Sequence, residues 1–174
     1  MLKLVLVFAA IAVTLSGCSS PASRQAMTPQ QMAVSKHYPY NLSVHTSGGS
    51  ETSGLDSSNI ADADLKAAVE EAVAKSALFK HVIQGSGGDY ELNVQVVSLA
   101  RPMIGTTLNV ELEMGWSLVR SADKAVVMRK SIQSTGNASM GDAFAFATRL
   151  RLAVEIAARN NIEQGIKAIA ELNL

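Results

Sequence analysis

Apolar residues recur along the chain with two different periods, which predict strands and helices in a definite order. Residues 38–44 and 90–96 place an apolar side chain at every second position, as expected for strands with one buried face. Residues 108–118 give the clearest alternation, and residues 125–134 follow them after a short polar turn. Residues 80–84 predict one further, short strand.

Two other segments repeat apolar residues at intervals of three and four, which indicates amphipathic helices. The first covers residues 62–79. The second helix follows residues 136–141, which begin and end with Gly and where we expect the sheet to end. Asp142 is its expected cap, and its many alanines predict a close approach to the sheet. Its apolar stripe changes direction at Asn160 and Asn161, where we expect a kink or a break. The basic residues expected on its solvent side are Arg149, Arg151 and Arg159.

The order of these elements predicts the fold class. A strand and a helix precede a run of three or four strands, and a second helix ends the chain. Such an order is typical of an α+β two-layer sandwich rather than of alternating β-α units. We expect a mostly antiparallel sheet of four to five strands with two helices on one face, forming a single domain over residues 38–174.

The amino terminus has the pattern of a targeting segment. Lys3 supplies a positive charge, and residues 4–15 form an apolar run shorter than the roughly 20 residues of a membrane-spanning helix. The string Leu-Ser-Gly-Cys that follows resembles the lipobox of bacterial lipoproteins, a family in which the signal peptide is cut before a diacylglycerol-modified Cys. The resemblance implies a signal peptide over residues 1–17 and a lipid on Cys18. The residues it assigns to signal-peptidase recognition are Leu15, Ser16 and Gly17.

The segment after the lipobox predicts a tether. Residues 18–37 are rich in Ser, Gln and Pro and show no sustained period, so we expect them to link Cys18 flexibly to the domain. Sorting in enteric bacteria, by the same resemblance, implies outer-membrane placement because Ser19 rather than Asp follows the Cys. The membrane is then the first expected partner, with the domain on its periplasmic side.

The composition argues against several kinds of binding and catalytic site. The chain has 174 residues, with 15 Lys and Arg against 15 Asp and Glu, so no basic excess favours nucleic-acid binding. The single Cys is assigned to lipid and leaves no thiol for a disulfide or redox site. His37, His45 and His81 lie far apart and lack acidic residues at metal-ligand spacing, so we expect no metal and no cofactor.

One short passage resembles a known group of proteins. Residues 73–82 read Val-Ala-Lys-Ser-Ala-Leu-Phe-Lys-His-Val, and Asp-Tyr-Glu-Leu follows at 89–92. Both resemble a passage in the auxiliary lipoproteins of ABC transport, which with the YajG-like lipoproteins share the fold of the TolB amino-terminal domain. Gly88 and Ala77 depart from the usual residues of that passage. The resemblance implies a β-α-β-β-β-α order and a non-catalytic partner of a larger envelope machine.

The strand at 108–118 supplies the candidate binding surface. Its apolar side chains share one face, so the opposite face is polar and open to a partner, by face contact or strand addition at the sheet edge. Glu111 and Glu113 on this face also form the one carboxylate pair that an enzyme could use. A solvated face is the commoner role, and we expect no catalytic residue. The residues of the predicted partner face are Asn109, Glu111, Glu113 and Ser117.

These observations favour a non-catalytic outer-membrane lipoprotein that binds an envelope protein as an accessory of an assembly or transport machine. The alternative is a lipid-binding or lipid-transfer module in which the helices and the Met114 and Trp116 side of the sheet enclose an acyl chain. The two differ in whether that apolar side is packed or hollow.

Overall fold

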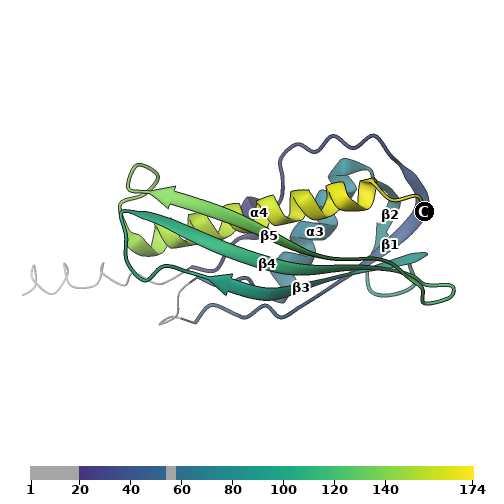
Figure 1. Ribbon diagram of the computed structural model, residues 1–174, viewed down its shortest axis with the longest axis horizontal. Helices are drawn as coiled ribbons and strands as arrows, with labels where there is room; N and C mark the ends of the chain where they lie inside the picture. The colour runs from purple at the N-terminus through teal and green to yellow at the C-terminus, as the bar shows by residue number, and fades with distance from the viewer. Residues whose placement is uncertain (1–19, 54–57) are drawn as a thin grey trace, which may run out of the picture.

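The computed structural model describes residues 20–53 and 58–174. Residues 1–19, which include the predicted signal peptide and Cys18, lie outside this part. The elements in chain order are α2 (Arg24–Met27), β1 (Tyr38–Ser47), α3 (Asp62–Ser76), β2 (Phe79–Ile83), β3 (Tyr90–Ala100), β4 (Thr107–Arg120), β5 (Val126–Ser139) and α4 (Phe146–Ala170). The order confirms the predicted α+β class (Figure 1).

All five strands form one sheet in the order β2-β1-β3-β4-β5. β1 is parallel to β2, because α3 carries the chain back over the sheet between them, and β1 is also parallel to β3. The remaining neighbours, β3-β4 and β4-β5, are antiparallel. The sheet is therefore mixed but mostly antiparallel by residue, since the long strands β3, β4 and β5 dominate it. β2 and β5 are its edges.

The hydrophobic core lies between the sheet and the helices α3 and α4. Every second residue of β4 from Leu108 to Leu118 is at most 1% exposed, as the alternation predicts. The predicted close approach of the alanine-rich helix is also confirmed. A Cβ built on Gly136 of β5 would lie 2.1 Å from the Ala153 carbonyl oxygen of α4, so only glycine fits at this crossing.

β5 and α4 differ from the prediction at their junction. β5 continues through Gly136 to Ser139, and α4 begins at Phe146 with Ala145 as its cap. Asp142 does not cap the helix, because its carboxylate accepts hydrogen bonds from the backbone and hydroxyl of Ser139 at 2.8 Å. This carboxylate turns the chain out of the sheet instead.

α4 is one continuous helix of 25 residues, so the break expected at Asn160 and Asn161 is wrong. Both asparagines bond across to the sheet rather than to the helix backbone. Asn160 donates to the Thr135 carbonyl at 2.9 Å, and Asn161 accepts a hydrogen bond from the Trp116 indole at 2.9 Å. Tertiary partners satisfy the polar side chains, which leaves the helical backbone bonds intact. Within the described residues no helix has the length and hydropathy needed to cross a membrane.

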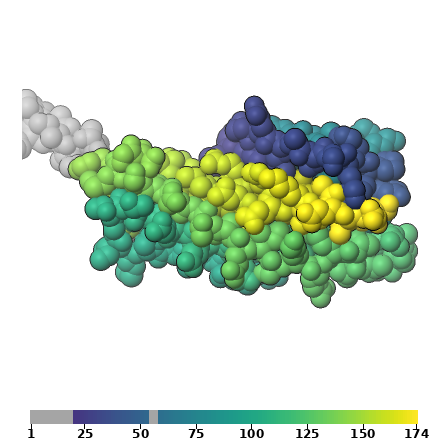
Figure 2. All heavy atoms as spheres, turned by 45° about the horizontal axis from the view of Figure 1, so that its top comes forward, coloured from purple at the N-terminus to yellow at the C-terminus, as the bar shows by residue number. Residues whose placement is uncertain are grey.

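The segment expected to be a flexible tether packs on the domain from residue 20 onward. We call residues 20–37 the strap. Figure 2 shows the strap, in purple, lying along α4, in yellow. Ala22 and Met27 are fully buried, and the buried Glu155 of α4 accepts hydrogen bonds from the backbone and hydroxyl of Ser23, both at 3.0 Å. Composition indicated flexibility, whereas two apolar side chains and one carboxylate on α4 fix the strap in place.

Candidate binding sites

The predicted partner face lies on the side of the sheet opposite α3 and α4, and no described helix covers it. Asn109 and Glu111 are exposed, whereas Glu113 and Ser117 are half-buried. The register of β4 with β5 places a polar residue opposite each of the four. The pairs are Asn109 with Asn137, Glu111 with Thr135, Glu113 with Gln133 and Ser117 with Arg129. The structure thus brings the four predicted residues onto one polar surface of the sheet.

A hollow of about 250 Å³ lies on this face, where the end of β3 meets the interior of β4 and β5. Glu111 and Glu113 line it from β4, Ser98 and Ala100 from β3, and Gln133 and Thr135 from β5. Glu113 accepts a hydrogen bond from the Ser131 hydroxyl of the neighbouring strand. The two carboxylates give the hollow an acidic lining that suits a basic or hydrogen-bond-donating group on a partner.

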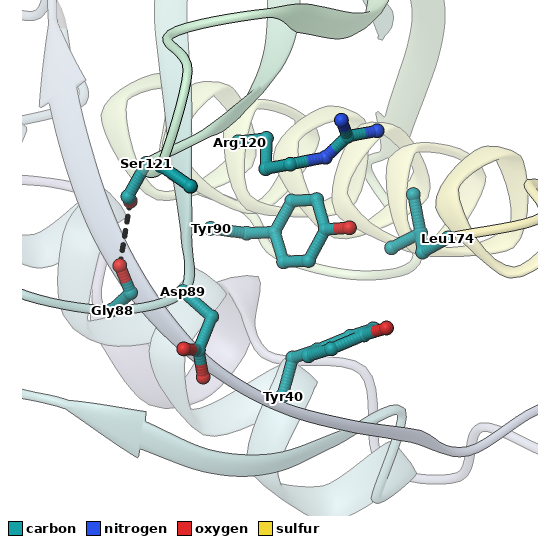
Figure 3. Close-up of a pocket in the computed structure, with 8 residues that line it drawn as sticks. Tyr40, Gly88, Asp89, Tyr90, Arg120, Ser121 and Leu174 are labelled. Atoms are coloured by element: carbon teal, nitrogen blue, oxygen red, sulfur yellow. Dashed lines mark hydrogen bonds between the residues drawn. The ribbon is translucent and has the colours of Figure 1, made fainter.

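A second hollow, which the sequence did not predict, lies at the end of the sheet where β1 and β3 begin and β4 ends. Its volume is about 590 Å³, within the range of small-ligand sites. Tyr40 of β1 and Tyr90 of β3 stand side by side with ring centroids 5.1 Å apart. Figure 3 shows the Tyr90 ring between Arg120 and Tyr40, with both phenol groups directed toward Leu174. The hollow is open because α4 ends at Ala170, while the inner side-chain row of β4 continues to Arg120.

The backbone around this hollow is held by short hydrogen bonds. Ser121 donates from its hydroxyl to the Gly88 carbonyl at 2.6 Å, and the Asp89 carboxylate accepts from the Asn41 backbone at 2.7 Å. A Cβ on Gly88 would lie 2.6 Å from the Ser43 nitrogen, so the turn before β3 requires glycine for close packing. The Gly-rich segment at residues 85–88 is a turn that supports this site.

Arg120 gives the hollow its positive charge. Hydrogen bonding to Tyr90, and then the charge of Asp123, raise the pKa of Arg120 above its ordinary value. Its guanidinium lies 3.1 Å from the Asp123 carboxylate in an exposed ion pair. A guanidinium beside two phenols can donate hydrogen bonds to an anionic or hydroxyl-rich group. Sequence reasoning missed this site because the register of three strands, rather than any motif, brings its residues together.

The remaining sequence expectations concern single residues. His37 in the strap, His45 on β1 and His81 on β2 are all exposed, and the described part of the chain holds no cluster of three metal-ligating side chains. Arg149 was expected in solvent but is only 5% exposed. It donates hydrogen bonds to the carbonyls of Gly105 at 3.2 Å and Phe144 at 2.6 Å, and so joins two loops.

The inner side of the sheet is packed rather than hollow. Met114 is fully buried and Trp116 is 1% exposed. A Cβ on Gly165 of α4 would lie 2.4 Å from the Trp116 ring, so helix and indole are already in direct contact. No room remains between them for an acyl chain, which contradicts the predicted enclosure of lipid on this side.

Comparison with known proteins agrees with the fold. No protein-family model matches the chain, and no curated protein sequence matches it. Protein XCC0632 from Xanthomonas campestris, of the family DUF330, superimposes with a TM-score of 0.59 at 15% identity, covering 82% of this chain and 94% of that protein. Protein CT253 from Chlamydia trachomatis gives 0.56 at 5% identity, covering 76% and 96%.

A dodecamer of PelC from Paraburkholderia phytofirmans gives a TM-score of 0.50 at 12% identity, covering 83% of this chain and 97% of that protein. Bacterial lipoproteins are also among the matching structures, at TM-scores below 0.5. The likeness to XCC0632, CT253 and PelC, at 5–15% identity, shows that this chain shares their α+β fold.

Proposed function

We propose that this protein is a lipoprotein anchored to the outer membrane through Cys18, with its domain in the periplasm. It acts as a non-catalytic accessory of an envelope assembly or transport machine and binds a protein partner on the polar face of β4. The lipobox motif supports the anchor, and the occurrence of this fold in bacterial lipoproteins agrees with it.

The observation that carries the proposal is the asymmetry of the sheet. One face is covered by α3 and α4, whereas the other carries Asn109, Glu111, Glu113 and Ser117 with no described element over it. The adjacent edge strand β5 offers 14 residues of backbone on its outer side. A polar face beside an unpaired edge suits contact with another protein, including strand addition.

The anchor is tested by Cys18→Ala in the producing cell. The unmodified chain should stay unprocessed or soluble instead of fractionating with the outer membrane. Mature protein that still fractionates there would contradict the lipobox interpretation.

The partner face is tested by cross-linking the lipidated protein in its own envelope and identifying the products by mass. Glu111→Lys with Glu113→Lys should abolish the specific product, because the charge of the hollow is reversed. Glu163→Lys on α4 is the matched control, since it reverses a carboxylate on the opposite layer. Capture unchanged by the double variant would remove this face from consideration.

The same experiment identifies self-association. PelC is a dodecamer, so each cross-linked mass is compared with multiples of this chain. A heterologous partner lost only in the double variant supports the accessory role. Products made solely of this chain would show that its partner is another copy.

A further inference from the structure

Two loops form an exposed apolar tip at one end of the domain. The loop between β3 and β4 carries Met103 at 90% and Ile104 at 86% exposure, and the loop before α4 carries Phe144 at 85%. Met140 and Phe146 are also exposed, at 48% and 37%. We call these five residues the apolar tip. Large apolar side chains this exposed, and gathered in one place, mark an interaction surface.

Strand pairing and the buried Arg149 hold the two loops together. β4 begins opposite the end of β5, with Thr107 paired to Ser139, so the loops emerge at the same end of the sheet. The buried Arg149 binds carbonyls of both loops, and Met103 and Phe146 line one shared hollow. The exposed side chains are therefore presented on a fixed base.

Ser20, the first residue that the structure describes, is joined through Ser58 to the base of the β3-β4 loop. Ser20, two residues after Cys18 in sequence, accepts a hydrogen bond from the Ser58 hydroxyl at 2.8 Å. The carbonyl of Ser58 in turn accepts a hydrogen bond from Arg101 at 2.8 Å. Arg101 begins the loop that carries Met103 and Ile104. Two extended residues span at most about 7 Å, so the predicted acyl chains on Cys18 start beside the loop base.

We infer that the apolar tip inserts into the bilayer surface beside the lipidated Cys18. This inference rests on the proposed anchor. The occupant is a lipid surface because the anchor holds one next to the tip, and because Met, Ile and Phe side chains suit the headgroup-acyl boundary. The loops carry one basic and one acidic residue, Arg101 and Asp142, so the attraction is apolar rather than electrostatic.

Insertion also fixes the orientation of the domain. β4 spans about 43 Å at roughly 3.3 Å per residue, and the Tyr40-Tyr90-Arg120 hollow lies at its other end. In Figure 1 the two loops and the chain terminus near Leu174 lie at opposite ends of the long axis. With the tip in the membrane, this hollow faces away from the bilayer, while the polar face of β4 runs along the membrane normal.

The test uses the thiol chemistry of the chain. Lipidation consumes Cys18, the sole cysteine, so a cysteine introduced elsewhere takes a fluorescent maleimide selectively. Ile104→Cys and Phe144→Cys probe the tip, and Ala122→Cys in the β4-β5 turn is the control at the far end. Each lipidated variant is placed in vesicles of phosphatidylethanolamine and phosphatidylglycerol, with or without doxyl-labelled phosphatidylcholine.

The expected result is a blue-shifted label at 104 and 144 that doxyl lipids quench severalfold more than the label at 122. Aqueous iodide should quench in the opposite order. If all three labels respond equally to iodide and none to doxyl lipid, the tip stays in water and the inference is wrong, while vesicle flotation still supports the anchor.

Two further outcomes also overturn it. Labels shielded from both quenchers would show that protein covers the tip, either a partner or, if shielding depends on concentration, a second copy. Absence of acyl mass on Cys18 would overturn the proposed anchor and the inference together. A second variant, Ile104→Ser with Phe144→Ser, removes the apolar contact at exposed positions without disturbing the core. In this variant a label on Met103→Cys should no longer be quenched more strongly by doxyl lipid than the control label at 122.

Discussion

Asn161 offers the most demanding test of how α4 is joined to the sheet. The side chain is fully buried and makes three hydrogen bonds. Its carbonyl accepts from the Trp116 indole at 2.9 Å, and its amide donates to the Ile132 carbonyl at 2.8 Å and the Ser134 hydroxyl at 3.1 Å. Asn161→Ala removes all three and leaves the indole N–H of a buried ring without a partner.

The magnitude follows from these bonds. Each buried hydrogen bond contributes about 1 kcal/mol net, and an orphaned buried donor costs about 1–3 kcal/mol. Alanine recovers about 0.5 kcal/mol through its higher helix propensity. With the indole bond counted within the cost of the orphaned donor and the other two bonds at about 1 kcal/mol each, the free energy of unfolding should fall by about 2.5–4.5 kcal/mol. With a urea m-value of about 2 kcal/mol/M, the midpoint drops by about 1.2–2.2 M.

The assay is urea unfolding followed by far-ultraviolet circular dichroism, with Asn160→Ala as the matched control. Asn160 is the preceding residue on the same helix, but it is only half-buried, and its amide donates a single hydrogen bond to the Thr135 carbonyl at 2.9 Å. Its replacement should cost less than about 1 kcal/mol. In a double-mutant cycle, Trp116→Phe with Asn161→Ala should show a coupling of about 1 kcal/mol or more. Equal losses in the two alanine variants, or no coupling, would refute the reasoning.

Three further predictions test other contacts. Gly165→Ala should destabilise by about 1–3 kcal/mol because its Cβ would meet the Trp116 ring, whereas Gly115→Ala on the open face should be neutral or slightly stabilising in the same melts. Glu155→Ala should speed tryptic cleavage after Arg24 severalfold by freeing the strap, whereas Glu163→Ala on the exposed side of α4 should not; equal rates would mean that Glu155 does not hold it. Tyr38→Phe should cost about 1 kcal/mol, because the phenol donates to the Leu172 carbonyl at 2.7 Å. Burial of the phenol, and to a smaller extent its electrostatic interaction with Tyr90, raise the pKa of Tyr38 above its ordinary value. Its stabilisation is therefore complete below the unfolded pKa of about 10 and is lost as pH rises through the folded value, so the variant should show a shallower alkaline loss of stability; an unchanged slope would contradict this.

The periodic parts of the fold were predictable from sequence. The alternation in residues 108–118 assigns each side chain of β4 to a face, because a strand has a period of two. The same reasoning put Asn109, Glu111, Glu113 and Ser117 on one polar surface, and the alanine-rich stripe of the last helix predicted close packing. These features depend only on local geometry and on the partition of apolar side chains from water.

Tertiary structure decided what depends on partners distant in sequence. The strap contains few apolar residues, yet Ala22 and Met27 are fully buried in the domain. Ser23 donates a hydrogen bond to Glu155, which is 132 residues away in sequence. Arg149 was expected in solvent but is buried. Its partners are carbonyls of two loops, and no local sequence pattern shows that these carbonyls will reach its guanidinium. Asn161 was expected to interrupt a helix, but the indole of β4 satisfies it.

The lipobox and the polar face of β4 are therefore determined by sequence alone, since a motif and a period are both local. The Tyr40-Tyr90-Arg120 hollow and the apolar tip exist only in the folded chain. Strand register brings the residues of the hollow together, and the two loops that Arg149 joins form the apolar tip. Their residues are far apart in sequence, and only the pairing of long strands makes them neighbours.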